Sequence, residues 1–430
     1  MNKPTTLRPS STVVAFLATC VLIPSLLSAA DPALGPWPQW RGPDANNHAG
    51  DDASLPTQWD MATGENIAWK TKLPGRGHST PIFTPLGIFL TTADASAGTQ
   101  SVLRLKLDSG QLTDQWVLHR GTLPAQIHPN NSYASPSMAF DGDLLFACFH
   151  TDDSIVLTAL SPDGHKKWQT KVSQFLPSAF QFGYGASPIV EQDLVIVAAE
   201  YDGPDSGIYA FERATGKRVW KIKRPENLNF ASPIVATIAG SRQLLIAGAD
   251  QFCSYDPVTG HKLWSVDTTT EAICGTAVWD DRYAIVSGGN PVAGTWCVSA
   301  SGQATVQWSN RVMCYEQSLL AIKHFVFAVA DNGVAYCWRS QDGKETWKQR
   351  LFGGGISASP LLAGGHVVVA SERGEVFILL ASPDRYQAVA QIQTGQSIFA
   401  TPVAIGNRLY IRTAMDESGK RQEYLVAIGK

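Results

Sequence analysis

Short apolar runs of strand length alternate along this chain with turns rich in Gly, Asp, Ser and Thr. In the clearest instance, the apolar run Ile208–Phe211 is followed by the turn Glu212–Gly216 and by a second run, Lys217–Lys221. Gly216 can adopt the positive φ that a tight hairpin requires. The pattern therefore predicts a β-hairpin whose second strand has one large apolar side chain, Trp220, to bury.

This unit repeats along the chain, and two positions mark each copy. A Trp in the strand after the turn recurs at Trp116, Trp168, Trp220, Trp264, Trp308 and Trp347, and Trp69 lies in such a strand without the turn before it. A short opener begins the next strand at Ser79-Thr80-Pro81, Ser135-Pro136, Ser187-Pro188, Ser232-Pro233, Gly275-Thr276-Ala277, Glu316-Gln317-Ser318, Ser359-Pro360 and Thr401-Pro402. Pro81 and Pro402 lie 321 residues apart, or about 46 residues per repeat over seven intervals, which is the length of a propeller blade.

Eight openers, with four strands in each of the seven intervals between them, predict an all-β, eight-bladed β-propeller of four-stranded antiparallel blades over residues 66–430. The last repeat has only three strands, Phe399–Ala404, Arg408–Thr413 and Tyr424–Ile428. One unpaired strand with a Trp, Asn66–Lys72, precedes the first opener. We expect this N-terminal strand to complete the last blade, because such closure leaves the ring without an open end.

The N-terminal residues have the character of an export signal. Lys3 and Arg8 precede an apolar stretch, residues 13–27, which is followed by small residues. We expect residues 1–30 to be a signal peptide, and the mature chain to be periplasmic or associated with the cell envelope, without a transmembrane span. Cys20 lies in a poor match to a lipoprotein signal, so no lipid anchor is expected there.

Residues 31–65 form an N-terminal extension that is too rich in Pro and Gly for a regular element. We expect it to wrap the outside of the last blade before the first strand begins. Trp37 and Trp40 are expected to pack against the propeller, and a ligand-binding role for the pair is the alternative.

Charge and cysteine content narrow the function classes. Without residues 1–30 the chain has 32 basic and 37 acidic residues and a net charge of −5, which favours neither nucleic acid nor an anionic membrane as a partner. Six cysteines remain, with no C-x-x-C pair. Most are expected to be buried free thiols, although an exported chain permits disulfides.

The pattern D/E-x-x-T-G-x-x-x-W, clearest in Glu212–Trp220 and Asp256–Trp264, resembles the repeat of pyrroloquinoline-quinone (PQQ) propellers. The resemblance covers residues 65–430 and implies that each Trp docks between neighbouring blades. The family includes quinoprotein alcohol and glucose dehydrogenases. It also includes exported propellers without enzymatic activity, such as BamB of the machinery that assembles outer-membrane barrels.

Departures from the dehydrogenase branch favour the non-enzymatic one. Quinoprotein alcohol dehydrogenases have a vicinal Cys-Cys disulfide over the cofactor, and this sequence has neither adjacent cysteines nor a C-x-x-C-H haem motif. We therefore expect a non-catalytic binding or scaffolding protein with a protein partner or small ligand in the envelope, no cofactor and no catalytic residue. The alternative is an oxidoreductase of alcohols or sugars that uses PQQ and calcium.

Loop length indicates the binding face, because long insertions in repeat proteins tend to mark it. The first two opener intervals have 55 and 52 residues, against 41 to 45 for the others. Part of the excess falls in His119–Ser132 and Val172–Gly185, two connections between blades on one face. The residues expected to bind a ligand or partner are His128, Asn130, Asn131, Tyr133, Phe180, Gln181, Tyr184, Asp202 and Asp205, with Phe182 beside them.

Two further sets of residues belong to the same face. The loops His150–Asp153 and Glu200–Asp205 hold carboxylates that could bind Ca²⁺, but their spacing matches no calcium loop, so we expect solvated turns and predict no metal site. His78, Cys274 and Glu316 lie just before or within openers. Since the openers form the innermost strands, these three side chains are expected to face the central channel.

Overall fold

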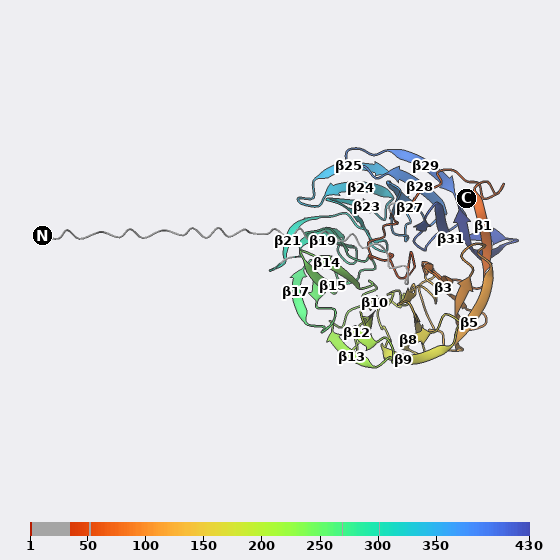
Figure 1. Ribbon diagram of the computed structural model, residues 1–430, viewed down its shortest axis with the longest axis horizontal. Coiled ribbons are helices and arrows are strands. Elements are labelled where there is room, and N and C mark those ends of the chain that lie inside the picture. The colour runs from red at the N-terminus through yellow and green to blue at the C-terminus, as the bar shows by residue number, and fades with distance from the viewer. Residues whose placement is uncertain (2–34, 51–52, 269, 301) are drawn as a thin grey trace.

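The computed structural model describes Met1 and residues 35–50, 53–268, 270–300 and 302–430. Within them the chain forms eight antiparallel sheets of four strands each, set around a central axis as the blades of a propeller (Figure 1). The prediction of an all-β, eight-bladed propeller is confirmed. A signal peptide is predicted at residues 1–30. Apart from Met1, these residues, Cys20 among them, lie outside the described residues. Within those residues, no helix has the length and apolar character to cross a membrane.

The strands are numbered along the chain, and each blade runs from the axis outward. Blade 1 consists of β2 (Ile82–Thr84), β3 (Gly87–Asp94), β4 (Thr99–Leu105) and β5 (Leu112–Arg120), and blade 2 of β6 (Ala139–Phe140), β7 (Leu145–Thr151), β8 (Ser154–Leu160) and β9 (Lys166–Gln174). Blade 3 consists of β10 (Ile189–Glu191), β11 (Leu194–Ala199), β12 (Gly207–Glu212) and β13 (Arg218–Lys223), and blade 4 of β14 (Ile234–Ile238), β15 (Ser241–Gly248), β16 (Gln251–Tyr255) and β17 (Lys262–Asp267). Blade 5 consists of β18 (Val278–Trp279), β19 (Tyr283–Gly288), β20 (Gly294–Ser299) and β21 (Thr305–Asn310), and blade 6 of β22 (Leu320–Ile322), β23 (Phe325–Val329), β24 (Val334–Arg339) and β25 (Glu345–Arg350). Blade 7 consists of β26 (Leu361–Ala363), β27 (His366–Ala370), β28 (Glu375–Leu380) and β29 (Ala388–Gln393), and blade 8 of β30 (Val403–Ile405), β31 (Arg408–Glu417), β32 (Lys420–Ile428) and β1 (Ile67–Leu73).

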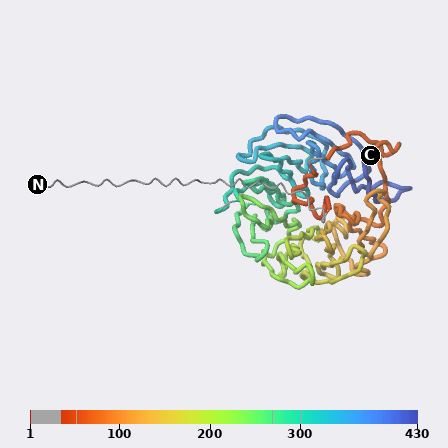
Figure 2. Tube along the Cα trace, in the orientation of Figure 1, coloured from red at the N-terminus to blue at the C-terminus, as the bar shows by residue number. Residues whose placement is uncertain are grey.

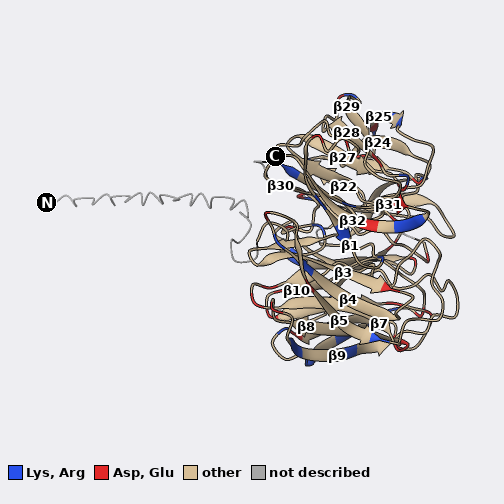
Figure 3. Ribbon diagram, turned by 90° about the vertical axis from the view of Figure 1, so that its right-hand side faces the viewer, with Lys and Arg blue, Asp and Glu red and all other residues tan. Residues whose placement is uncertain are grey.

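The eighth blade closes the ring as predicted. β1 pairs antiparallel with β32, in a register that sets Trp69 opposite Ala427 and Leu73 opposite Glu423. β31 and β32 are longer than predicted, at ten and nine residues. Seen from the side, acidic and basic residues lie together on β32 and are interspersed over the visible surface (Figure 3).

The position of a strand in its blade sets its pattern of burial. β11, in the middle of blade 3, is buried at all six positions, because neighbouring blades cover both of its faces. β13, at the outer edge of the same blade, has exposed residues at four of six positions, and Trp220 is partly buried. Seven of the eight outer strands, all but β29, hold a Trp, and exposed residues flank it in each.

The predicted Trp residues lie at the junctions between blades. The Trp168 ring packs on Gly216 of the next blade, where φ is +73° and an added Cβ would lie 2.5 Å from the ring. Its Nε1 donates to the Arg213 carbonyl oxygen at 2.9 Å. Similar contacts join Trp69 to Gly110, Trp116 to Gly164, Trp220 to Gly260 and Trp308 to Gly343, and Trp347 donates to the Ser382 carbonyl oxygen. Trp264 differs, since its Nε1 donates to Gln243 Oε1 of its own blade at 2.8 Å.

A ring of hydroxyl side chains joins the blades at the start of their innermost strands. The Ser187 backbone N–H donates to Ser232 Oγ of the next blade at 2.9 Å, and bonds of 2.9–3.0 Å recur around the axis. This hydroxyl ring consists of Thr80, Ser137, Ser187, Ser232, Thr276, Ser318, Ser359 and Thr401. In blade 2 its member is Ser137, so the opener predicted at Ser135-Pro136 is two residues early. Ser135 instead donates to Asn131 Oδ1 at 2.5 Å in the preceding turn.

The N-terminal extension crosses the central channel, so the expectation that it wraps only the outside of the last blade is wrong. Figure 2 shows the start of the described chain, in red, at the centre of the ring. Its backbone and side chains contact the innermost strands of five blades, pairing Trp37 with Phe83, Pro38 with Phe140, Gln39 with Val190, His48 with Ala321 and Ala49 with Leu362. The extension then reaches the last two blades, where Trp59 Nε1 donates to Thr394 Oγ1 at 3.0 Å.

Candidate functional site

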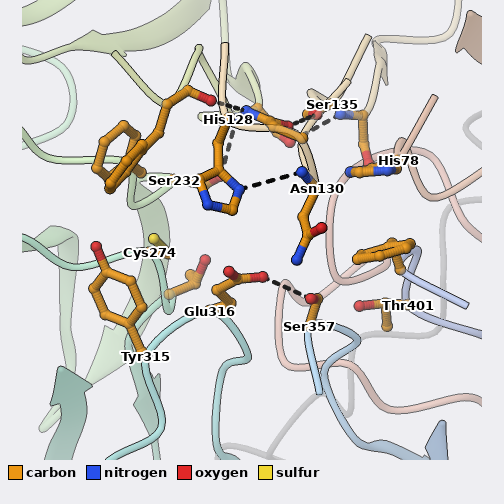
Figure 4. A pocket seen from close by; sticks show the side chains of 18 of the residues that line it. His78, His128, Asn130, Ser135, Ser232, Cys274, Tyr315, Glu316, Ser357 and Thr401 are labelled. Carbon is orange, nitrogen blue, oxygen red and sulfur yellow. Dashed lines mark hydrogen bonds between the residues drawn. The ribbon is translucent and has the colours of Figure 1, made fainter. Parts of the chain in front are cut away.

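A cavity of about 370 Å³ lies on the propeller axis, at the end of the channel where the innermost strands begin (Figure 4). Every blade contributes the residue two positions before its member of the hydroxyl ring: His78, Ser135, Gly185, Phe230, Cys274, Glu316, Ser357 and Phe399. In extended backbone, residues two apart point to the same side. These eight therefore form a layer above the hydroxyl ring, and we call the cavity the funnel.

The N-terminal extension forms the floor of the funnel. Trp40 lines the cavity, and its Nε1 donates to Thr276 Oγ1 of the hydroxyl ring at 3.0 Å. Arg41, next along the chain, is buried and donates to the carbonyl oxygens of Ala45 and Leu319 at 3.0 and 3.2 Å. Because these contacts fix Trp40 across the axis, the mouth of the funnel lies on the face of the long loops.

Aromatic rings form much of the funnel wall. His78 stacks on Phe399, with ring centroids 4.6 Å apart and planes 10° apart. Phe182 stacks on Phe230 at 6.1 Å and meets the edge of His128 at 5.1 Å. Such faces suit flat, apolar or cationic groups.

Hydrogen bonds hold the first long loop over the funnel. Asn131 Nδ2 donates to the Phe182 carbonyl oxygen at 2.5 Å and so joins the two long loops. The Arg76 guanidinium donates to the carbonyl oxygens of Pro129 and Asn130 at 3.1 and 2.8 Å. The loop is thus anchored to blade 1, and its side chains are presented at fixed positions.

Asp202 organises the second long loop. Its carboxylate accepts hydrogen bonds from the backbone N–H groups of Ser178 and Ala179 at 3.0 and 2.8 Å. Although burial alone would raise the pKa of Asp202, the hydrogen bond from the Ser178 hydroxyl and these two backbone hydrogen bonds bring the pKa below its usual value. The loop presents Phe180 at the rim, 40% exposed, with φ of +47° and its ring 5.6 Å from Phe182. A bulky residue in that region of φ is strained, and such strain is concentrated at functional sites.

Glu316 supplies a carboxylate to the funnel wall. Ser357 Oγ lies 2.6 Å from Glu316 Oε2 and 2.8 Å from Glu372 Oε1. A hydroxyl has one proton, so Ser357 donates to one carboxylate at a time. Burial raises the pKa of Glu316, the nearby Glu372 and Asp331 carboxylates raise it further, and the Ser357 hydroxyl and His128 act in the opposite direction.

Three other titratable groups of the funnel are held in their neutral forms. Burial and nearby arginines lower the pKa of His78 well below its usual value. Burial and the Glu316 carboxylate raise the pKa of the Cys274 thiol, and burial raises the pKa of the Tyr315 phenol. A thiol with a raised pKa is a poor nucleophile, so these groups do not form an activated pair.

The structure brings part of the predicted set together. The residues that line the funnel are His128, Asn130, Asn131 and Phe182, and with them the expected channel residues His78, Cys274 and Glu316. Phe180 and Gln181 are exposed at the rim, and Gln181 Nε2 donates to the Pro177 carbonyl oxygen at 3.3 Å.

Four further predicted residues lie outside the funnel lining, and one of them, Asp202, anchors the second long loop. Tyr184 is buried in the core between blades, and its hydroxyl donates to the Ala198 carbonyl oxygen at 2.8 Å. Asp205 pairs with Lys221 at 3.2 Å, and Tyr133 lines a neighbouring groove. The sequence could not separate these residues from the lining, because loop residues adjacent in sequence turn in different directions.

Within the described residues, the six cysteines form no disulfide bond, and the acidic loops form no cluster of metal ligands. Cys148, Cys253, Cys274, Cys297, Cys314 and Cys337 are free thiols, five of them buried. Glu200 pairs with Arg224 at 3.2 Å. The described ranges contain no group of three or more His, Cys, Asp or Glu side chains placed to hold a metal ion.

Sequence reasoning missed several lining residues, among them Phe230, Tyr315, Ser357 and Phe399, and gave a ligand-binding role for Trp40 only as the alternative. Position would have found three of these: Phe230, Ser357 and Phe399 lie two residues before the hydroxyl ring. No repeat signal points to Trp40, because it reaches the funnel from outside the repeats.

The ring closure, the Trp residues docked between blades and the axial funnel define a PQQ-like β-propeller. The family model described as outer membrane protein assembly factor BamB matches residues 49–176, 135–349 and 308–395. The chain belongs to this BamB-like family of PQQ-like propellers.

Solved structures with the same fold include BamB and two dehydrogenases. BamB from Moraxella catarrhalis superposes with a TM-score of 0.55 and 19% identity, over 83% of this chain and 95% of that chain. A europium-containing methanol dehydrogenase superposes with a TM-score of 0.62 and 11% identity, over 93% of this chain and 98% of that chain. Quinohemoprotein alcohol dehydrogenase from Comamonas testosteroni superposes with a TM-score of 0.50 and 12% identity, over 92% of this chain and 81% of that chain. At these identities the likeness shows the fold alone. A comparison with curated protein sequences gives no match.

Proposed function

We propose that this chain is an exported binding protein of the cell envelope, which receives a ligand or a segment of a partner protein in the funnel without catalysing a reaction on it. The observation that carries the proposal is the lining of the funnel. Aromatic faces and amides surround the cavity, while His78, Cys274 and Tyr315 stay in unreactive neutral forms. This lining suits recognition better than bond-making chemistry.

The rim supports a protein partner as the occupant. Phe180 is held exposed and strained by a loop that Asp202 anchors, which is an arrangement that costs stability. An exposed aromatic beside a deep cavity is typical of anchor sites in protein interfaces. The similarity to the BamB family supports an envelope location and a protein partner.

The alternative is a PQQ- and calcium-dependent dehydrogenase, which similarity of fold to two solved dehydrogenases supports. The donor set of the funnel fits that cofactor poorly. PQQ has three carboxylates, and none of the described residues that line the funnel is Lys or Arg. Ca²⁺ takes six to eight oxygen ligands, and Glu316 is the one carboxylate among those lining residues. The lining therefore favours the binding role.

Site-specific photo-crosslinking in intact cells tests the proposal. A photoreactive phenylalanine analogue would replace Phe180 at the mouth or, as a control, Val258, which is 44% exposed in the turn between β16 and β17 on the opposite face. We expect a discrete adduct with an envelope protein from position 180 and none from position 258. Adducts from position 258 alone, equal labelling at both positions, or no adduct at either would contradict a protein partner at the mouth.

A further inference from the structure

We infer that the funnel binds an organic cation, an ammonium or guanidinium group, with Glu316 as its counter-ion. The inference names the ligand class of the binding role proposed above and rests on it. It comes from the distribution of charge, hydrogen-bond donors and aromatic faces around the cavity.

Carboxylates gather on the side of the funnel formed by blades 6 and 7. Glu316 and Glu372 share the single proton of the Ser357 hydroxyl, so one of them lacks that donor at any time. Asp331 lies near Glu316 and accepts from Gln317 Nε2 at 3.0 Å. None of these three carboxylates is in an ion pair with a described residue. A bound cation would supply the charge and the donors that the protein leaves out.

The three arginines whose charges act on His78 are engaged elsewhere, and one of them, Arg421, pairs with Glu423 at 2.8 Å. Arg76, whose charge affects His78, donates to backbone carbonyls of the first long loop. Arg412 is buried and donates to Glu423 and to the Thr91 carbonyl oxygen at 3.3 and 2.9 Å. These groups leave the Glu316 side of the funnel as the side that attracts a cation.

Aromatic faces complete a site for a cation. Tyr315 precedes Glu316 in the chain, and Phe230 and Trp40 line the same cavity. In Figure 4 the Glu316 carboxylate and the His128 imidazole approach from opposite walls, and the Asn130 amide lies between them at one side. An aromatic face attracts a cation within about 6 Å of the ring centroid, most strongly when the cation is desolvated, and this attraction adds to that of the carboxylate.

The same chemistry has two possible sources, a free small amine or the side chain of a Lys or Arg in a partner protein. Isothermal titration of the mature chain, Asp31–Lys430, separates them. Choline and the acetylated amide of Ala-Arg-Ala serve as cationic probes. Their neutral isosteres, 3,3-dimethyl-1-butanol and the citrulline tripeptide, keep the shape and remove the charge.

We expect a cationic probe to bind at least about tenfold more tightly than its isostere, and Glu316→Gln to remove that preference. A preference for choline would indicate a small amine, and one for the arginine peptide a partner side chain. Glu345→Gln, which removes an exposed carboxylate from β25, is the matched control and should leave binding unchanged. Circular dichroism and the melting temperature confirm that each variant is folded.

Several results would overturn the inference: isosteres that bind as tightly as the cations, Glu316→Gln with unchanged affinity, an equal loss in Glu345→Gln, or no binding of either cation at millimolar concentration. Binding of the isosteres would still leave a binding funnel. Oxidation of an alcohol or sugar that requires PQQ and calcium would instead contradict the proposed function itself, so the two failures are distinguishable.

Discussion

The two ends of the central channel differ, because one is filled by the chain and the other holds a cavity. At one end the chain's own extension, Trp37 to Ala49, fills the axis and bonds to the innermost strands. At the other, the residues before the hydroxyl ring leave a cavity of about 370 Å³. The same repeat builds both ends, so the difference comes from segments outside it, the extension and the two long loops. The repeats make the scaffold, and the non-repeating segments decide where a ligand fits.

The largest change in stability is expected from a substitution in the extension at the closed end. Trp37 is 1% exposed and packs in the core shared with β2 and β31. Trp37→Ala should lower the free energy of unfolding by about 3–5 kcal/mol, because it removes a buried indole and leaves a cavity. Urea unfolding followed by circular dichroism measures the change. A loss under 1 kcal/mol would show that the extension is not an integral part of the fold.

A smaller effect should follow at the floor. Thr276→Val keeps the shape of the side chain but removes the acceptor of the Trp40 Nε1 hydrogen bond. The indole N–H is then left without its partner, at a cost of about 1–2 kcal/mol. Thr237→Val, on an exposed position of β14, is the control and should change stability by less than about 0.5 kcal/mol. Equal effects in both variants would contradict the role of Trp40 as a fixed floor.

At the open end, stability and binding should move in opposite directions. Phe180→Gly removes an exposed ring and relieves the strain of its positive φ. We expect the free energy of unfolding to stay the same or rise by up to about 1 kcal/mol. The same variant should weaken capture of a partner, read from crosslinks placed at Gln181. Undiminished crosslinking would exclude Phe180 as an anchor.

The smallest effect is a dependence of stability on pH. Because burial raises the pKa of Glu316 above 4.5, the folded chain binds this proton more tightly than the unfolded chain. The ionised group therefore costs stability above the folded-state pKa, and the cost disappears as pH falls to 4.5. Glu316→Gln should melt at a higher temperature than the natural chain at pH 8, with the gap closing near pH 4.5. A gap that is constant with pH would contradict this assignment.

Most of the fold could be predicted from the sequence because its signals repeat. Seven Trp residues and eight openers in near-constant register predict the blades, and counting strands predicts the closure of β1 on β32. The path of the extension could not be predicted, because residues 35–50 occur once and contain no regular strand. Their position depends on the space that the eight blades leave at the axis.

The site could be predicted only in part. Loop length and the openers point to His128, Asn131 and Glu316, all of which line the funnel. Composition alone could not tell that Tyr184, two residues after Phe182, turns into the core. Side-chain direction in irregular loops depends on tertiary hydrogen bonds, such as those that Asp202 makes to Ser178 and Ala179.

Titration of a chain of residues 31–430 with PQQ and Ca²⁺ tests most directly whether the funnel serves binding or dehydrogenation. Tryptophan fluorescence, corrected for absorption by PQQ, would report on Trp40 at the floor, and reduction of an electron-accepting dye would report on turnover. We predict no saturable quenching at micromolar PQQ and no oxidation of alcohols or sugars. Saturable quenching together with PQQ-dependent turnover would contradict the binding role and identify the protein as a dehydrogenase.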